Sequence, residues 1–239
     1  MDEVLSMRSS HKWLLGYCTI VLVTLLTAHC GSRAVTTLAE SRPVENRIAI
    51  IIDAGHGGVD GGAVSCTGIL ESRYNLEIAL RMNDLLRFLG METVMIRTED
   101  VSVYTKGETI GQKKISDLKE RVRIANAQKK AVLLSIHQNN FPDGRYSGAQ
   151  VFYSGTTGSQ ELAKKLQINL VQYLNPGSRR LEKKSNGIYL MEHITCPGVL
   201  IECGFLSNPE EEAKLRREDY QQKLCAVIAC TVCEYLSNT

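Results

Sequence analysis

The sequence lacks the features that mark several common classes of protein. Its 239 residues carry 28 Lys and Arg against 26 Asp and Glu, so no surplus of positive charge points to a nucleic-acid partner. It has a single CxxC, Cys230 to Cys233, whereas a four-thiolate zinc cage needs two such pairs. GxSxG, P-loop, GxGxxG and HExxH motifs are all absent. These absences argue against serine hydrolases of the elbow type, phosphate-loop and dinucleotide enzymes, and HExxH metalloproteases.

The N-terminal segment differs from the rest of the chain. Residues 13–28, WLLGYCTIVLVTLLTA, carry no charge and follow a basic stretch. This length suits either an export signal or a membrane anchor. Because cleavage signals near Cys30 are poor, we expect an uncleaved anchor over residues 1–30, with its basic side in the cytoplasm. A polar linker over 31–46 and a folded domain over 47–239, outside the membrane, are expected to follow.

Apolar runs and helical periodicities alternate along the expected domain. Strands are expected over 48–52, 93–96, 131–136, 150–153, 188–191 and 199–201, and helices over 73–89, 116–128, 161–174 and 220–236. Ser116 is the expected cap of the second helix. Several strands are continuous apolar runs, which is typical of strands buried on both faces. The pattern predicts an α/β fold with a mostly parallel sheet and helices on both faces.

Two histidines follow matching strands. His56 comes after the apolar run IAIIID, and His137 comes after the apolar run AVLLSI. Residues just beyond the carboxyl ends of parallel strands converge on one crevice, so the two imidazoles can meet although they are distant in sequence. The glycines around His56 in DAGHGG allow a sharp turn. That turn also fits a phosphate-cradling loop, but it contains no Lys.

Glu71 stands at the start of the helix that follows the glycine-rich turn. Together with His56 and His137 it makes a set of two imidazoles and one carboxylate, which is the donor set of many catalytic zinc sites. Simpler structural roles are open for the same residues. His56 can be a turn residue, and Glu71 can complement the helix dipole.

Glu202 closes the apolar strand within GVLIECG. A carboxylate at the end of a buried strand is costly unless it is paired or functional. Beside a metal ion it can accept a proton from water and return it to a leaving amine. The alternative is a salt-bridged structural carboxylate.

The segments IIDAGHGG, GILESRYNL, LLSIHQNN and LIECGFLSNPEE occur in this order along the chain. They resemble the four signature blocks of the zinc-dependent N-acetylmuramoyl-L-alanine amidases of catalytic type 3, over about residues 48–236. The resemblance implies that His56, Glu71 and His137 hold one Zn²⁺ ion and that Glu202 is the catalytic acid and base. It also implies a three-layer α/β/α sandwich around a roughly six-stranded sheet.

A narrower resemblance comes from KKISDLKERVRIAN, YSGAQVFYSG and YLMEHITCPG. These segments are similar to those of the germination-specific, CwlD-type amidases of endospore formers. The similarity implies hydrolysis of the amide between the lactyl group of N-acetylmuramic acid and L-alanine in spore-cortex peptidoglycan, which prepares muramic δ-lactam. It further implies an exported enzyme, anchored in the membrane or secreted into the cell wall or the forespore intermembrane space.

Three other functions compete with this one. They are a general autolysin amidase, a zinc peptidase that cuts within the stem peptide, and a non-catalytic wall-binding module. Substrate-binding residues and protein partners are not indicated by the sequence.

Two further residues, Cys203 and His193, lie close in the sequence to the segments of the expected site. Strand alternation is expected to turn Cys203 away from the Glu202 face, and His193 is expected to make loop or core hydrogen bonds.

Overall fold

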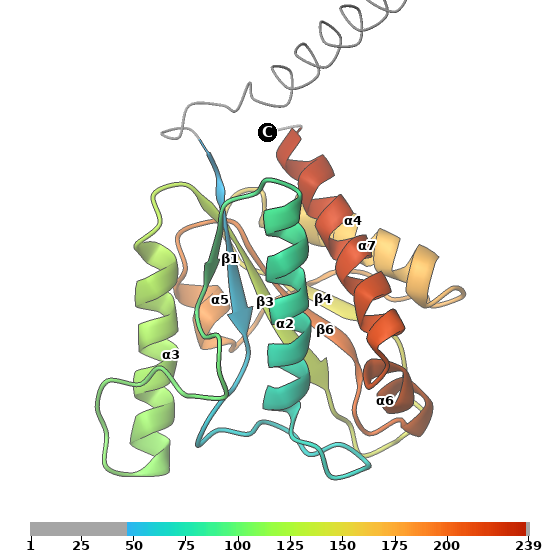
Figure 1. Ribbon diagram of the computed structural model, residues 1–239, viewed down its shortest axis with the longest axis horizontal. Coiled ribbons are helices and arrows are strands. Elements are labelled where there is room, and N and C mark those ends of the chain that lie inside the picture. The colour runs from blue at the N-terminus through green and yellow to red at the C-terminus, as the bar shows by residue number, and fades with distance from the viewer. Residues whose placement is uncertain (1–46, 238–239) are drawn as a thin grey trace, which may run out of the picture. The chain divides into compact units, whose positions relative to one another are not determined.

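The computed structural model describes residues 47–237, so the expected anchor and linker lie outside the described residues. Strands and helices alternate along the chain (Figure 1). In chain order the elements are β1 (Ala49–Ala54), α2 (Glu71–Phe88), β2 (Thr93–Met95), α3 (Ile110–Asn126), β3 (Ala131–Asn139), β4 (Gln150–Tyr153), α4 (Ser159–Leu174), β5 (Lys183–Lys184), α5 (Tyr189–His193), β6 (Gly198–Phe205), α6 (Pro209–Leu215) and α7 (Glu218–Ser237). Within residues 47–237, no helix has the length and apolar character needed to span a membrane.

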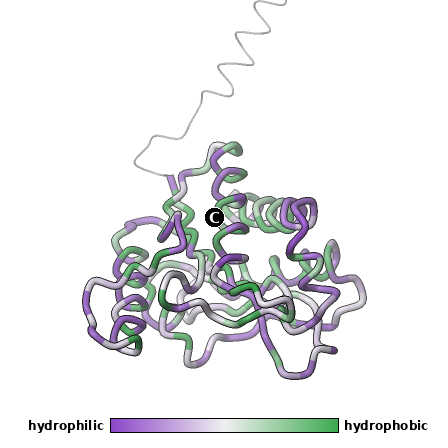
Figure 2. The backbone as a smooth tube through the Cα atoms, turned by 60° about the horizontal axis from the view of Figure 1, so that its bottom comes forward, coloured by the Kyte–Doolittle hydropathy of each residue, from purple (hydrophilic) through white to green (hydrophobic). Residues whose placement is uncertain are grey.

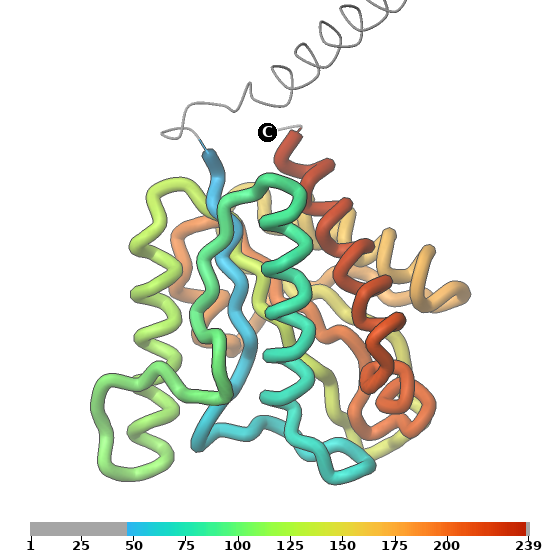
Figure 3. Tube along the Cα trace, viewed as in Figure 1, coloured from blue at the N-terminus to red at the C-terminus, as the bar shows by residue number. Residues whose placement is uncertain are grey.

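The strands form one six-stranded sheet in the order β2-β1-β3-β6-β4-β5. The first four strands in this order are parallel, and β4 pairs with β6 in the antiparallel sense. The expectation of a mostly parallel, roughly six-stranded sheet is therefore confirmed. The first strand lies in the interior of the sheet, and α7, close to the end of the chain, lies beside α2 (Figure 3).

Apolar layers cover both faces of the sheet. In β1, Ile50 and Ile52 pack into one core with α2, α4 and α7, whereas Ile51 packs into a second core with α3 and α5. This arrangement explains the unbroken apolar runs, because alternate residues of a strand point to opposite faces. Hydrophobic positions gather on the inner elements, and hydrophilic ones lie along the outside (Figure 2). The predicted three-layer sandwich is confirmed.

Two local predictions are wrong. Residues 188–191 were expected in a strand, but Tyr189–His193 form the short helix α5, whose Leu190 and Met191 fill the second core. The helix α3 begins six residues before the expected Ser116 cap. Thr109 and Gln112 form a capping box there, because each side chain accepts a hydrogen bond from the other's backbone N–H.

The start of α2 is bonded to the glycine-rich segment that follows β1. Leu70, at the N-cap, provides no side-chain cap. Instead, the N–H groups of Glu71 and Ser72 donate to the carbonyls of Ala63 and Gly61, at 2.8 and 3.0 Å. These bonds satisfy N–H groups that a helix leaves unpaired at its start. They also place the first residue of α2 against the segment that carries His56.

Candidate metal centre

His56 occupies a strained position just after β1. Its φ is +60°, and it is the one non-glycine residue with a positive φ among the described residues. Such a backbone conformation is costly for a residue with a side chain, and it persists where surrounding bonds impose it. The ring is also oriented by Asp60, whose Oδ2 lies 2.9 Å from Nδ1 of His56.

Two buried arginines supply the bonds that impose this turn. Arg97 donates to the carbonyls of Ala54 and Gly55, at 2.8 and 3.0 Å. Arg121 donates to the carbonyls of Ala54 and His56, at 2.9 and 2.7 Å. Guanidinium groups thus hold three consecutive backbone carbonyls, those of residues 54–56. Sequence reasoning missed both residues.

Glu71 is buried at the first position of α2, with 4% of its surface exposed. Its Oε2 accepts the N–H of Ala63 at 3.0 Å, and its Oε1 accepts the N–H of Gln138 and the side-chain amide of Asn75, both at 3.2 Å. Three donors from three different segments therefore fix the carboxylate. This number of bonds is more than a residue needs in order to complement a helix dipole.

His137 belongs to β3, and its ring lies directly over Gly55. A Cβ atom added to Gly55 would lie 2.2 Å from both Cε1 and Nε2 of His137. Only glycine therefore leaves room for the imidazole at this point. The requirement comes from space, since the backbone of Gly55 does not have a positive φ.

The structure brings His56, Glu71 and His137 together. Nε2 of His56 lies 3.3 Å from Oε2 of Glu71, and Nδ1 of His137 lies 3.1 Å from Oε1 of the same carboxylate. The two ring centroids are 5.0 Å apart. One donor atom from each residue lies within 4.8 Å of the others. Two imidazole nitrogens and one carboxylate oxygen at this spacing suit a zinc-type cation.

Electrostatics within this cluster favour a charged Glu71. Burial opposes ionisation of the carboxyl, but hydrogen bonds from His137 and His56 hold the pKa of Glu71 well below its usual range. Burial likewise opposes the charged imidazole of His56, yet Glu71 and Asp60 together raise its pKa. The charged carboxylate of Glu71 thus gives the cluster a centre of negative charge that favours a bound cation.

Glu202 lies beside this cluster on the next strand. It pairs with His137 across the β3–β6 register. Its Oε2 is buried and has no hydrogen-bond partner among the described residues, so the salt-bridged alternative is not what the structure shows. Burial, and to a smaller extent the charge of Glu71, raise the pKa of Glu202 to about 7 against the opposing effect of His137 and His56. A carboxyl group with such a pKa is suited to exchange protons near neutrality.

Two other residues named from the sequence lie away from this cluster. Cys203 is buried in the core on the other face of the sheet, and burial raises the pKa of its thiol. The expectation that it turns away from the Glu202 face is confirmed. His193 is exposed at the end of α5, where its Nδ1 lies 2.8 Å from the carbonyl of Tyr189 and its ring stacks on the Tyr189 ring.

We expect Arg121→Met to destabilise the fold by about 3–5 kcal/mol, because it leaves two carboxylates without their partner in the interior. Arg121 forms ion pairs with Asp53 and Asp117, and all three side chains are largely buried. The measurement is urea unfolding at equilibrium. Arg123→Met on the same helix is the matched control, since its ion pair with Glu120 is at the surface, where solvent screens it, and its loss is expected to leave the stability almost unchanged. Equal effects of the two changes would contradict this account of Arg121.

The fold and the cluster define a class of protein. A three-layer α/β/α domain with two imidazoles and a carboxylate at the carboxyl edge of its sheet has the layout of a metal-dependent α/β hydrolase. The profile of the family described as Amidase_3, N-acetylmuramoyl-L-alanine amidase, matches residues 50–234. The chain belongs to this N-acetylmuramoyl-L-alanine amidase family.

Individual relatives agree with the family. The chain is 36% identical to the germination-specific N-acetylmuramoyl-L-alanine amidase of Bacillus subtilis, over 97% of this chain and 98% of that one. Among solved structures it is similar to the CwlD amidase of Clostridioides difficile, solved in complex with the GerS lipoprotein, with a TM-score of 0.77, 36% identity and coverage of 81% of this chain and all of that one. It is also similar to the catalytic domain of CwlV from Paenibacillus polymyxa, with a TM-score of 0.65, 31% identity and coverage of 80% and 99%.

Proposed function

We propose that this chain is a zinc-dependent amidase that cleaves the bond between the lactyl group of N-acetylmuramic acid and L-alanine, with spore-cortex peptidoglycan as its substrate in the cell. The observation that carries the proposal is the convergence of His56, Glu71 and His137 beside Glu202, whose Oε2 has no hydrogen-bond partner within residues 47–237. The likeness to the germination-specific amidase, along nearly the whole of both chains, supports the cortex as the substrate. The N-terminal segment would carry the enzyme across the cytoplasmic membrane and anchor it there.

His56, Glu71 and His137 would hold the zinc ion. The donor set fits, because zinc accepts imidazole nitrogen and carboxylate oxygen, and three protein ligands leave a position open in catalytic sites. Asp60 would fix the orientation of the His56 ring through Nδ1, as carboxylates commonly do for histidines that bind metals. Zinc in such a site supplies a Lewis acid that polarises a carbonyl and makes water more acidic.

Glu202 would move the proton of the reaction. In the proposed hydrolysis, its carboxylate takes a proton from the attacking water, and the carboxyl group then gives that proton to the departing alanine nitrogen. A pKa raised to about 7 by burial allows both roles near neutral pH. Its Oε2 accepts no hydrogen bond from the residues that the structure describes, so this atom is available as an acceptor for the water.

The experiment that tests this function is digestion of purified cortex and vegetative peptidoglycan by the zinc-loaded, full-length chain, followed by mass analysis of the products. An amidase releases intact stem peptides and leaves bare lactyl groups on the glycan. A peptidase would release shortened stems, and a wall-binding module would release nothing; either result would overturn the proposal. Equal cleavage of both substrates would favour a general autolysin over a cortex enzyme.

We expect Gly55→Ala to weaken zinc binding by about 10-fold to 100-fold, because the new methyl group displaces the His137 ring. Competition with a chromophoric chelator measures the affinity. Gly111→Ala is the matched control: nothing lies within 4 Å of the position of its added Cβ, and alanine suits its place in α3. Unchanged zinc affinity in Gly55→Ala would show that the position of His137 does not matter for the metal.

A further inference from the structure

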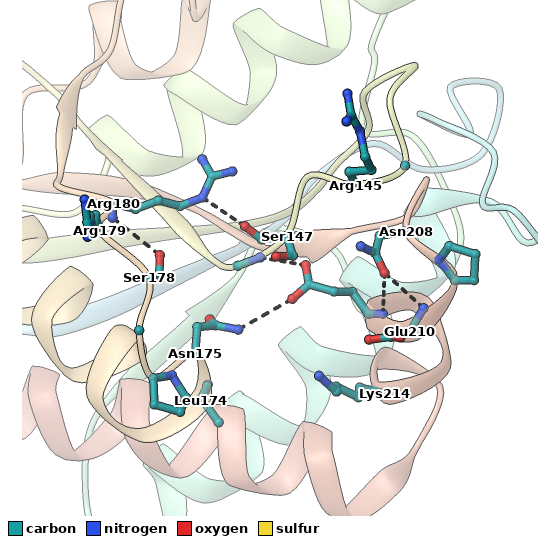
Figure 4. A pocket seen from close by; sticks show the side chains of 16 residues that line it. Arg145, Ser147, Leu174, Asn175, Ser178, Arg179, Arg180, Asn208, Glu210 and Lys214 are labelled. Carbon is teal, nitrogen blue, oxygen red and sulfur yellow. Dashed lines mark hydrogen bonds between the residues drawn. The ribbon is translucent and has the colours of Figure 1, made fainter.

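A groove of about 1080 Å³ opens at the same edge of the sheet as the candidate metal centre. Its walls are three segments, 144–148 before β4, 174–180 after α4 and 208–214 around α6 (Figure 4). None of the four proposed site residues lines it. Its residues come from the carboxyl side of β6 and the amino side of β4, which meet at one edge because these two strands are antiparallel.

Strand register connects this groove to the metal centre. Glu202 pairs with His137 on one side and with Gln150 on the other. Residues directly opposite each other in neighbouring strands point to the same face of a sheet, so the three side chains form a row. Strands lie about 4.8 Å apart, which places the backbone of Gln150 about 10 Å from that of His137. Arg180 continues the row, since its Nη1 lies 3.4 Å from Oε1 of Gln150.

Arg180 is held in place by groups that do not neutralise it. Its Nε donates to the carbonyl of Ser147 at 3.0 Å, and its guanidinium lies 5.0 Å from the centre of the Phe205 ring. Figure 4 shows the side chain reaching from the segment after α4 toward Ser147. Within residues 47–237, Arg180 forms no ion pair with a carboxylate. Its orientation is therefore fixed while its charge is available to a ligand.

The groove as a whole carries excess positive charge. Arg145, Arg179, Arg180 and Lys214 line it, against Glu210 and Glu211. Arg145 is paired with Asp143 at 2.7 Å, so the excess comes from Arg179, Arg180 and Lys214. The carboxylate of Glu211 is buried and already accepts the N–H groups of Gly148 and Phe205 at 2.9 and 3.0 Å. It holds the floor of the groove together and is not placed to neutralise Arg180. A ligand that enters this groove should bring negative charge.

We propose that the groove binds a free carboxylate on the second or third residue of the peptidoglycan stem peptide, with Arg180 as the residue that determines this specificity. The inference rests on the proposed function, because it takes the scissile amide to lie at the metal centre. An extended peptide advances about 3.3–3.6 Å per residue, so about three residues cover the distance of about 10 Å between the backbones of His137 and Gln150. Both the second and the third stem residue can carry a carboxylate, and a guanidinium binds carboxylates through two parallel hydrogen bonds.

The test uses the zinc-loaded, full-length chain and three N-acetylmuramoyl tripeptides. One has free carboxylates, the second is amidated on its second residue, and the third is amidated on its third residue. Arg180→Met should lower kcat/KM for the free tripeptide at least about tenfold, mainly by raising KM. The amidated tripeptide that has lost the recognised carboxylate should be cleaved equally by the parent and by Arg180→Met. That tripeptide identifies which of the two carboxylates is bound.

Lys164→Met is the matched control, because Lys164 is an exposed cation on α4 outside the groove. Calorimetry with the released stem tripeptides, free and amidated, measures their affinity for the groove in the absence of turnover. Absence of hydrolysis would contradict the proposed function. The difference in tripeptide affinity between the parent and Arg180→Met would still test the role of the groove. If Arg180→Met lost kcat/KM equally for all three tripeptides, or for none of them, the assignment of Arg180 as the carboxylate-binding residue would be wrong.

Discussion

Glu202→Gln is expected to lower kcat by about 10²–10⁴-fold, because an amide cannot accept the proton from the attacking water or return it to the leaving nitrogen. Zinc content should stay at the level of the parent, since Glu202 is not one of the three clustered donors. The chain should fold normally, because the change replaces a buried carboxyl whose Oε2 has no hydrogen-bond partner in the described part of the chain. Release of stem peptides from peptidoglycan and metal analysis provide the two measurements.

Glu92→Gln is a suitable control for that experiment. Glu92 is exposed just before β2, so the change removes the same charge far from the proposed chemistry. Its activity should equal that of the parent. Near-normal turnover by Glu202→Gln with zinc still bound would require another residue to handle the proton and would remove Glu202 from the mechanism.

His137→Ala is expected to lose zinc and with it essentially all activity. One of the three candidate ligands disappears, and the two that remain, His56 and Glu71, cannot supply the three protein ligands of a catalytic site. The measurements are bound zinc after dialysis against a weak chelator and hydrolysis of peptidoglycan. The fold should persist, because the His137 side chain lies near the carboxyl end of β3 and belongs to neither hydrophobic core.

His193→Ala is the control for that prediction. His193 is an exposed histidine whose ring stacks on Tyr189, outside the cluster, so zinc and activity should be unchanged. Full zinc occupancy in His137→Ala would show that the metal is held elsewhere. The assignment of all three ligands would then need to be abandoned.

The convergence of the site could be predicted because it depends on strand ends. His56, His137 and Glu202 each follow an unbroken apolar run, and parallel strands bring their carboxyl ends to one edge. Glu71 could be placed from the start of the next helical pattern. The glycine at position 55 was expected to serve a sharp turn, whereas the structure shows that it makes room for an imidazole.

The two arginines behind the turn could not be predicted in the same way. Arg121 falls on a helix rich in charged residues, so the sequence predicts an exposed position for it. Only the packing of α3 against the sheet reveals that it is buried. Arg97 follows a short strand and bonds almost entirely to carbonyl groups, a role that leaves no pattern in sequence. The early start of α3 does have a signal in the sequence, because Thr109 and Gln112 have the spacing of a capping box.

The bonds from Arg97 and Arg121 to the His56 turn also bear on when the proposed metal site forms. These bonds come from the chain itself, as do those that join the start of α2 to the same segment. The turn therefore acquires its shape during folding, in contrast to small domains that collapse only around their metal. The proposed zinc ion could therefore enter a site that is already formed, and removal of the ion from the folded chain should be reversible.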